Sequence, residues 1–455
     1  MKYDVVVIGA GAGGAYTSLS LARAGLRVAL VESKPKGKIG DKPCGDAIGK
    51  HHLESLGLAL PKEAVVHRYR GVKVYSPSGK HSIEVLGEGV SVDRIAFGKW
   101  LVDSAVGAGA ELFAGCAARE PRLSGDFVSS VEVACIDGRR LELEAGFFVD
   151  ASGAVPALRS RLPRSWPISE RPLTSDYNVA YREVVELEKP MEDVDYAVIH
   201  VDAAVAPGGY WWAFPKDAEG RVVNVGLGVV WTSGINPRTR FEESLRPLFR
   251  GRVLHTGGGL VPTRRPLPTL VWRNVAVVGD AAYTVNPVHG GGIGSTLEAA
   301  SIVSRWIVKA FEEGKIDERA TWPANKEYME VYGAKQAGLD VLRMFLQMLA
   351  NDDLEWIVSS GIVDGASLYE VSSAGKLGEA LLRKISGTLR LLARPSMLSR
   401  LRMVRDYMEA ARSLYLDEYP RTPDGLGEWQ RRADALFREF AERIGYRLGQ
   451  EVSWR

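Results

Sequence analysis

Cysteine is scarce in this sequence: three of its 455 residues are cysteines, Cys44, Cys116 and Cys135. A sparse, odd-numbered set is not the pattern of a disulfide framework, and no two of these residues have the spacing of zinc ligands. The set therefore predicts a chain without a disulfide framework or a metal site, in a reducing, intracellular and cytoplasmic setting.

Long apolar runs and an excess of one charge are also absent. No 18 consecutive residues are apolar, so no transmembrane helix is predicted. The formal net charge is only +2, which argues against nucleic acid as a partner. With 46% hydrophobic and 25% charged residues, the chain is long enough for two or three packed globular domains.

Contact with a membrane surface is left open by one segment near the C-terminus. Residues 381–407 interleave Leu, Ile and Met with Arg383, Lys384, Arg390, Arg394, Arg400, Arg402 and Arg405. This pattern fits a basic amphipathic surface that meets anionic lipid. A solvated helix face explains it at least as well.

The N-terminus has the sequence of a dinucleotide-binding βαβ unit. The apolar run 5–8 predicts a strand buried on both faces, followed by Gly9-Ala10-Gly11-Ala12-Gly13-Gly14, a helix over about 13–24 and a strand over 27–31 that ends at Glu32. In such units the first glycine allows the tight turn, the second lets a pyrophosphate approach the backbone, and the third lets helix and strand pack closely. The helix N-terminus favours phosphate, and an acid placed like Glu32 accepts hydrogen bonds from a ribose. We expect the cofactor to contact Gly9, Gly11, Gly13, Gly14 and Glu32.

A second glycine-rich segment distinguishes FAD from NAD. A buried strand over 274–278 ends in Gly279-Asp280, and Pro287-Val288-His289-Gly290-Gly291-Gly292-Ile293-Gly294 leads into a helix over about 294–313. The free N–H groups at such a helix start suit the electron-rich O2 edge and ribityl chain of a flavin. Asp280 suits the ribityl or phosphate region. The predicted cofactor is FAD, held at both ends.

The order of these patterns predicts an α/β fold with a Rossmann-type FAD-binding domain, an inserted, mostly antiparallel β-sheet substrate domain and a helical C-terminal region. We expect residues 1–60, 90–165 and 271–320 to form a discontinuous FAD-binding domain. Residues 61–89 and 166–270 are rich in strand-forming residues and are expected to form the substrate domain. Residues 321–455 have helical spacing throughout.

Three stretches identify a family. They are Lys42-Pro43-Cys44-Gly45-Asp46, Tyr210-Trp211-Trp212-Ala213-Phe214-Pro215-Lys216 and Asn286-Pro287-Val288-His289-Gly290-Gly291-Gly292. Together they closely resemble the archaeal geranylgeranyl reductases, within the flavoprotein superfamily of para-hydroxybenzoate hydroxylase. The resemblance runs nearly the whole chain, and its C-terminal part is similar to the crenarchaeal type with a long helical tail. Asp150-Ala151-Ser152-Gly153 resembles the motif that closes the nucleotide domain in this superfamily.

The resemblance implies an FAD-dependent reductase that saturates the isolated double bonds of geranylgeranyl chains, carried as diphosphates or on archaeal ether lipids. It implies a substrate site made of Tyr210, Trp212, Phe214, Pro215 and Lys216. It adds Pro43, Cys44, Gly45, Arg94, Ala118, Asp280, Gly291, Gly292 and Ile293 to the cofactor contacts. Cys44 and His289 are the candidate catalytic residues.

Each of these assignments has a plainer alternative. The aromatic residues can be ordinary core, Cys44 a small packed hydrophobe, and His289 a residue that shapes the turn at the flavin. Arg264 and Arg265 either bind phosphate or form salt bridges.

The electron source and the overall activity also have alternatives. Only one complete nucleotide fingerprint is present, so an external donor is expected: NAD(P)H, ferredoxin or another carrier. The rival activities are a flavin monooxygenase on the same scaffold and a non-catalytic carrier of prenyl lipids.

Overall fold

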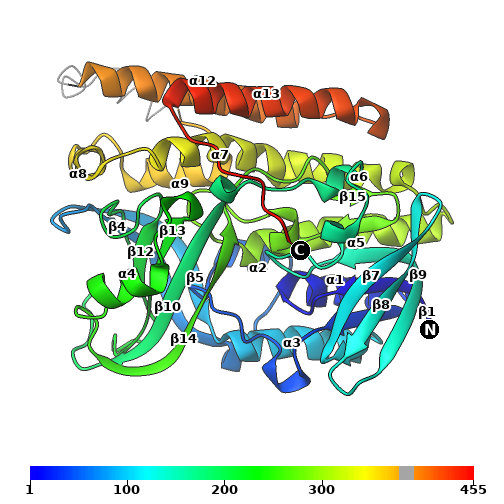
Figure 1. Ribbon diagram of the computed structural model, residues 1–455. Coiled ribbons are helices and arrows are strands. Elements are labelled where there is room, and N and C mark those ends of the chain that lie inside the picture. Colours follow the sequence, from blue (N-terminus) through cyan, green and yellow to red (C-terminus); the bar gives the residue numbers. More distant parts are fainter. Residues whose placement is uncertain (379–393, 455) are drawn as a thin grey trace.

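The computed structural model describes residues 1–378 and 394–454, which fold around two eight-stranded sheets. Figure 1 shows the two sheets side by side, with the C-terminal helices lying across them as further layers. The expected fold class, a Rossmann-type unit with a second sheet and a helical C-terminal region, is confirmed.

The first sheet contains the dinucleotide-binding unit. Its strands run in the order β15-β16-β9-β1-β2-β6, with β7 and β8 added through β9. The bounds are β1 Lys2–Ile8, β2 Val28–Glu32, β6 Glu111–Ala114, β7 Cys116–Ser124, β8 Phe127–Cys135, β9 Arg140–Asp150, β15 Val271–Trp272 and β16 Val275–Val277. The central pairs β16–β9, β9–β1, β1–β2 and β2–β6 are parallel, so the carboxyl ends of these strands meet at one edge.

Helices cover the central, parallel strands of this sheet. They are α1 Ala12–Arg23, α3 Arg94–Gly107 and α5 Ile293–Glu312, close to the bounds that the sequence predicts. Val5, Val6 and Val7 are completely buried beneath them. An uninterrupted apolar run favours a strand that is buried on both faces, because all of its side chains are then removed from water.

The second sheet has the order β14-β10-β13-β12-β11-β4-β5-β3. Its strands are β3 Ala47–Gly49, β4 Val65–Tyr75, β5 Ser82–Val92, β10 Tyr177–Leu187, β11 Tyr196–His200, β12 Tyr210–Pro215, β13 Val222–Val230 and β14 Gly251–Pro262, with helices α2 Lys50–Ser55 and α4 Pro237–Ser244. All its pairs are antiparallel except β11–β4. The exact bounds of the domains stay a prediction.

The C-terminal helices pack on one another and on the rest of the molecule. They are α6 Glu318–Tyr328, α7 Ala334–Leu346, α8 Asn351–Ser359, α9 Gly365–Ala374, α12 Pro395–Leu416 and α13 Leu426–Ile444, with a π-helical turn over Met329–Gly333 between α6 and α7. Figure 1 shows α12 and α13 as the outermost layer.

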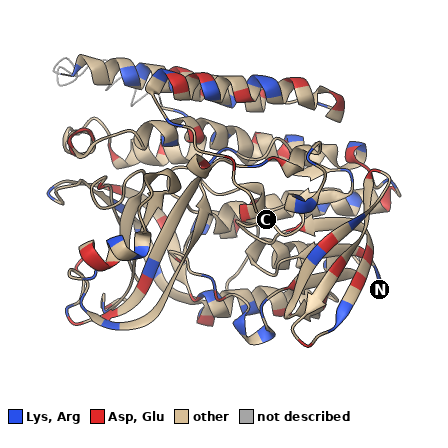
Figure 2. Ribbon diagram, in the orientation of Figure 1, with Lys and Arg blue, Asp and Glu red and all other residues tan. Residues whose placement is uncertain are grey.

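The basic segment near the C-terminus is only partly described. Residues 381–393, with Arg383, Lys384 and Arg390, lie outside the described residues. Within α12 and just before it, Arg394 and Arg400 both approach Asp353, at 3.0 and 3.7 Å, and so face the protein. Figure 2 shows acidic and basic residues mixed along α12 and α13. No helix in the described ranges combines the length and apolar character needed to cross a bilayer.

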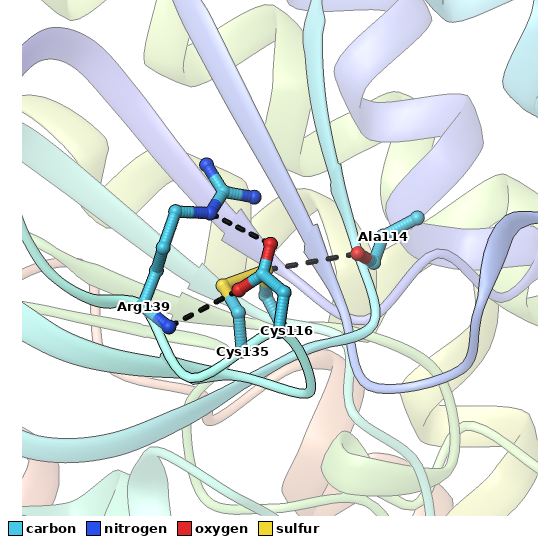
Figure 3. The surroundings of a disulfide bond; sticks show 5 residues. Ala114, Cys116, Cys135 and Arg139 are labelled. Atoms are coloured by element: carbon cyan, nitrogen blue, oxygen red, sulfur yellow. Dashed lines mark hydrogen bonds and ion pairs between the residues drawn. A yellow bond between two sulfur atoms is a disulfide. The ribbon is translucent and has the colours of Figure 1, made fainter.

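The expectation that the cysteines form no disulfide is wrong. Cys116 and Cys135 lie directly opposite each other on β7 and β8, with their Cα atoms 3.9 Å apart, and their sulfur atoms are bonded. Figure 3 shows the bond beside Ala114 and Arg139. The reason is the antiparallel pairing, which no cysteine count reveals. The inference of a reducing compartment, which rested on that count, loses its basis.

The disulfide predicts a measurable stabilisation. Replacing both Cys116 and Cys135 by serine opens a loop between residues 19 apart in sequence. Loops of that size restrict the unfolded chain by about 3 kcal/mol. In denaturant unfolding, the free energy of unfolding of the double variant should be lower than that of wild type by about this amount. The Cys44→Ser variant should show no such decrease. Equal stability of the double variant and wild type would contradict the assignment.

Candidate active site

The glycine turn after β1 is shaped by contacts with the backbone of the protein itself. Gly9 has φ of +100°, and a Cβ there would lie 2.5 Å from the carbonyl oxygen of Ala151. A Cβ at Gly14 would lie 1.8 Å from the carbonyl oxygen of Gly9. Both positions therefore require glycine for the turn to close. Gly11 differs, because no protein atom lies within 4 Å of a Cβ built on it.

The turn that follows β9 supports this glycine turn from the other side. The buried carboxylate of Asp150 accepts hydrogen bonds from the backbone N–H groups of Ser152, Leu158 and Arg159, at 2.7 to 3.1 Å. Ala151 is thereby held against Gly9. The Asp150-Ala151-Ser152-Gly153 motif thus fixes the shape of the phosphate-facing turn.

Glu32 lies at the end of β2, beside the same turn. One carboxylate oxygen accepts a hydrogen bond from Ala10 N at 2.8 Å and the other from Lys34 N at 2.8 Å. The Lys34-bonded oxygen, Oε1, also accepts a hydrogen bond from Ser33 Oγ at 3.1 Å, so the Ala10-bonded oxygen, Oε2, is the one that keeps a further lone pair. The carboxylate is therefore oriented and still able to accept hydrogen bonds from a ribose diol.

Three charged residues are further candidates for the cofactor site. They are Lys42 in the loop after β2, Arg94 at the start of α3, and Asp280 after β16. Lys42 Nζ lies 2.7 Å from Asp280 Oδ2, and the charge of Asp280 raises the pKa of Lys42. Arg94, the first residue of α3, has its Nε and Nη1 atoms buried without a hydrogen-bond partner. Buried guanidinium nitrogens without partners are costly, and an anionic ligand is a suitable partner for them.

The second glycine segment forms the start of α5. Ile293 is the first residue of the helix and Gly292 precedes it. A Cβ at Gly292 would lie 2.9 Å from Val285 and 3.6 Å from Asp280 Oδ1, and a Cβ at Gly291 would lie 2.7 Å from the His289 ring. The helix start therefore keeps its N–H groups close to Asp280, as the predicted cofactor site requires.

Two predicted cofactor residues lie where packing alone explains them. A Cβ at Gly13 would lie 2.7 Å from Thr296 of α5, so Gly13 allows α1 and α5 to approach. Ala118 is buried in β7 opposite Val133. A cofactor contact at either residue stays a prediction.

The site fits FAD on three observations. Space lies beside Gly11, the buried nitrogens of Arg94 lack partners, and Glu32 is oriented at the end of β2. Gly9, Gly11, Arg94 and Glu32 would hold the phosphates and ribose, while Asp280 and the start of α5 would hold the flavin end.

The aromatic motif occupies one face of β12. Alternate side chains of a strand point to opposite faces, so Tyr210, Trp212 and Phe214 share one face and Trp211 and Ala213 the other. Trp212 and Phe214 pack with Tyr69 and Ala197, whereas Trp211 and Ala213 belong to a separate core cluster. Pro215 ends the strand and is buried, and its carbonyl accepts a hydrogen bond from Tyr69. Three of the predicted substrate residues, Tyr210, Trp212 and Phe214, therefore share one apolar face.

The loop that carries Cys44 lies against this surface. A Cβ at Gly45 would lie 2.9 Å from the Phe214 ring, and a Cβ at Gly257 of β14 would lie 2.3 Å from the Pro43 ring. The absence of side chains at these two glycines lets the loop and the sheet touch. Pro43, Cys44 and Gly45 are thus brought to the aromatic motif across more than 160 residues of sequence.

Asn224 joins the two segments by hydrogen bonds. This fully buried residue of β13 donates to the Cys44 carbonyl at 2.7 Å and to Asp46 Oδ2 at 3.0 Å, and it accepts from Trp212 Nε1 at 3.1 Å. Lys216 Nζ lies 2.9 Å from the same Asp46 oxygen. Lys216 is therefore held in an ion pair, and its predicted contact with a substrate phosphate stays untested.

Cys44, Tyr210 and His289 are the polar groups near the aromatic face. The Cys44 thiol is free and partly exposed. Tyr210 donates its hydroxyl hydrogen to the His289 carbonyl at 2.5 Å. Burial raises the pKa of Tyr210 and the nearby Cys44 raises it further, so the hydroxyl stays protonated.

The His289 imidazole is neutral at pH 7. Although the residue is accessible to solvent, enclosure by surrounding protein lowers the pKa of His289 to about 4, and the charges of Lys335 and His52 act in the same direction. Its Nδ1 accepts a hydrogen bond from Gly291 N at 3.1 Å, so the ring also shapes the turn. The ring can donate only through Nε2–H, as a neutral imidazole.

Arg264 and Arg265 form salt bridges. Arg264 is buried between Glu170 and Asp176, at 2.6 and 3.2 Å, and Arg265 reaches Asp434 at 2.9 Å. Of the two alternatives for Arg264 and Arg265, phosphate binding and salt bridges, the structure shows salt bridges.

The sequence did not reveal several polar residues of this region. Asn224 interrupts an apolar strand, and that interruption was the one available signal. His52 and Glu298 form a pair at 2.6 Å across 246 residues, for which no local pattern exists. No group of three or more His, Cys, Asp or Glu in the described ranges is arranged to hold a metal ion.

Known proteins are similar to this chain. Residues 4–156 match the family model "FAD dependent oxidoreductase" and residues 176–261 match "Geranylgeranyl reductase catalytic domain". Digeranylgeranylglycerophospholipid reductase of Sulfolobus acidocaldarius is 38% identical over 97% of this chain and 98% of its own. Digeranylgeranylglycerophospholipid reductase 2 of Methanopyrus kandleri is 33% identical over 69% of this chain and 78% of its own.

A solved structure shows the same fold. It is the geranylgeranyl bacteriochlorophyll reductase-like protein of Thermoplasma acidophilum, with a TM-score of 0.75 and 22% identity, covering 89% of this chain and 99% of its own. The fold, the site and these matches define an FAD-dependent oxidoreductase. More closely, the chain belongs to the digeranylgeranylglycerophospholipid reductase family, and the resemblance expected from the sequence is confirmed.

The open space at Gly11 gives a test of the cofactor position. A Gly11→Val side chain meets no protein atom, so we expect the variant to fold but to lose most of its FAD because it fills the predicted pyrophosphate position. Bound FAD is measured by absorbance after gel filtration, and folding by circular dichroism. Gly107→Val, equally unobstructed at the end of α3, is the control and should keep FAD. Full occupancy in Gly11→Val would show that the pyrophosphate lies elsewhere.

Proposed function

We propose that this protein uses reduced FAD to saturate the isolated double bonds of geranylgeranyl chains, carried on ether lipid precursors or as the diphosphate. The observation that carries the proposal is the docking of the Cys44 loop on the aromatic face of β12 through Asn224. This docking brings the cofactor-binding segments and an apolar surface together within one site. The segment matched to the geranylgeranyl reductase catalytic domain, residues 176–261, contains this surface.

The apolar surface suits a polyprenyl chain. Tyr210, Trp212 and Phe214 are rigid aromatic residues of the kind that contact an alkyl chain at little entropic cost, and Trp212 and Phe214 are each 8% exposed in this structure. Burial of the substrate contributes about 0.8 kcal/mol for each CH₂ group removed from water. Chain length therefore dominates affinity, and residues 61–89 and 166–270 serve as the substrate domain.

Reduction of an unconjugated alkene needs a hydride and a proton. Bound and reduced, FAD supplies the hydride to one carbon. The chain must deliver a proton to the other carbon, in a site from which water is excluded. Cys44 is a free cysteine near the aromatic face, burial keeps the Tyr210 hydroxyl protonated, and His289 offers only its neutral N–H. Among these we assign the proton-handling or alkene-positioning role to Cys44.

The electrons and the lipid come from outside the chain. NAD(P)H, ferredoxin or another carrier reduces the flavin, because the chain has one complete nucleotide fingerprint and FAD occupies it. The lipid substrate favours peripheral contact with a membrane.

Product analysis tests the function. The protein, with its FAD reduced by dithionite, is incubated anaerobically with a geranylgeranyl lipid. The masses of the products are then measured by mass spectrometry. Each saturated bond adds two hydrogens, and a C20 substrate should outcompete a C5 prenyl diphosphate by far. The variant Phe214→Asp should weaken lipid binding while FAD stays bound. Addition of an oxygen atom in air would instead indicate a monooxygenase, and lipid binding without any product would indicate a carrier.

Substitution of Cys44 tests its role. We expect Cys44→Ser and Cys44→Ala to keep the fold and FAD, while the rate of lipid reduction or the number of bonds saturated falls. The measurement is anaerobic reoxidation of reduced flavin by lipid, with products counted bond by bond. If both variants retain wild-type rates and product patterns, Cys44 is a packing residue.

A further inference from the structure

A cluster of titratable groups lies beside the start of α5, and the proposed reaction leaves it without a role. His51 and His52 are neighbours on α2, with ring centroids 4.0 Å apart. His52 Nδ1 lies 2.6 Å from Glu298 Oε1 of α5, and the two side chains are 18% and 19% exposed. Among the described residues, none gives His52 Nε2 a hydrogen-bond partner.

The His52 ring packs directly on the first turn of α5. A Cβ at Gly294 would lie 2.1 Å from its Cδ2 atom, so glycine at this position makes room for the imidazole. The first N–H groups of a helix have no partners within the helix and carry partial positive charge. Nε2 is thus an additional, titratable polar group at the helix start that is expected to meet the flavin.

Glu298 is held ionised at this position. Burial alone would raise the pKa of Glu298, but the hydrogen bond from His52 and the charges of His52, Lys335 and His51 bring it below its ordinary value. The carboxylate can therefore balance a proton on the imidazole to which it is bonded.

The other titratable groups around the pair lie on α7, on α2 itself and on the loop before α5. Lys335 lies on α7, and burial lowers its pKa while Glu298 acts in the opposite direction. Burial, and then the charge of His52, lower the pKa of His51, which also senses exposed Glu54 on α2. His289 lies on the loop before α5. Within this group Glu298 is bonded to His52, whereas Glu54 pairs with Lys50 at 3.4 Å.

We propose that His52, held by Glu298, takes up a proton when the flavin is reduced and so balances the negative charge of the reduced flavin beside the start of α5. Two electrons from the external donor and one proton convert the oxidised flavin to its anionic reduced form, with the proton on N5. A second proton passes from solvent to His52 Nε2. When the hydride leaves N5 for substrate, the flavin loses its charge and His52 returns its proton to solvent. The inference rests on the proposed function for the placement of the flavin ring at this helix.

The test counts protons during reduction of the holoenzyme, without lipid. The flavin midpoint potential is measured by spectroelectrochemistry at several values above about pH 7, where an imidazole is ordinarily neutral. Its dependence on pH gives the protons taken up per two electrons. We expect close to two in wild type. His52→Gln should take up close to one and have a lower midpoint potential, since the compensating charge is lost.

Two further variants sharpen the test. Glu298→Gln keeps the imidazole but removes its carboxylate, so the pH range with two protons should move to lower pH. His51→Gln, at the neighbouring ring that has no carboxylate partner among the described residues, is the matched control and should behave as wild type. The proposal is overturned if His52→Gln keeps the wild-type proton count, or, should that variant not retain FAD, if Glu298→Gln leaves the pH range unmoved. Because no lipid is present, failure to reduce geranylgeranyl chains would count against the proposed function alone.

Discussion

The buried hydrogen bonds of Asn224 are the constraint on which the rest of the site depends. They join the carbonyl of Cys44, the carboxylate of Asp46 and the indole of Trp212, which come from two segments almost 180 residues apart. Breaking such a bond leaves a buried polar group unpaired, at a cost of about 1–3 kcal/mol. The loop that follows the nucleotide unit is thereby fixed against the aromatic strand.

The ion pair of Asp46 and Lys216 holds the loop in the same position, but its formation has unfavourable contributions to the free energy. The Asp46 side chain is buried and that of Lys216 is 14% exposed, and Asp46 has a φ of +64°, which is unfavourable for a residue with a side chain. Buried ion pairs often add little net stability because their desolvation offsets the attraction. The pair does, however, allow few alternative positions for the loop. Gly45 and Gly257 complete the fit, since a Cβ at either would push the loop from the sheet.

The sequence predicts the parts of this structure that depend on neighbours along the chain. The strand, glycine turn and helix at the N-terminus, the helix over Arg94–Gly107 and the glycine-rich start of α5 all follow from local patterns. Contacts between distant segments do not: the Cys116–Cys135 bond depends on strand register, and the pair of His52 and Glu298 on the packing of α2 against α5. Even a correctly recognised motif does not say which glycine does what. Gly11 adjoins open space and Gly13 adjoins Thr296, although the sequence shows the same residue type at both positions.

The distribution of charge agrees with the chemistry of an unactivated alkene. Transfer of a proton to such a bond creates positive character on carbon, which an unbalanced cation nearby would disfavour. At the aromatic face Lys216 is neutralised by Asp46, the His289 ring is uncharged at pH 7 and Tyr210 is protonated. The groups that can gain positive charge, His52 above all, lie instead at the start of α5, where the reduced cofactor is expected to be negative. The residues at the aromatic face are thus neutral or paired, whereas the start of α5 carries groups that can gain a proton, and the hydrogen bond from Tyr210 to His289 links the two regions.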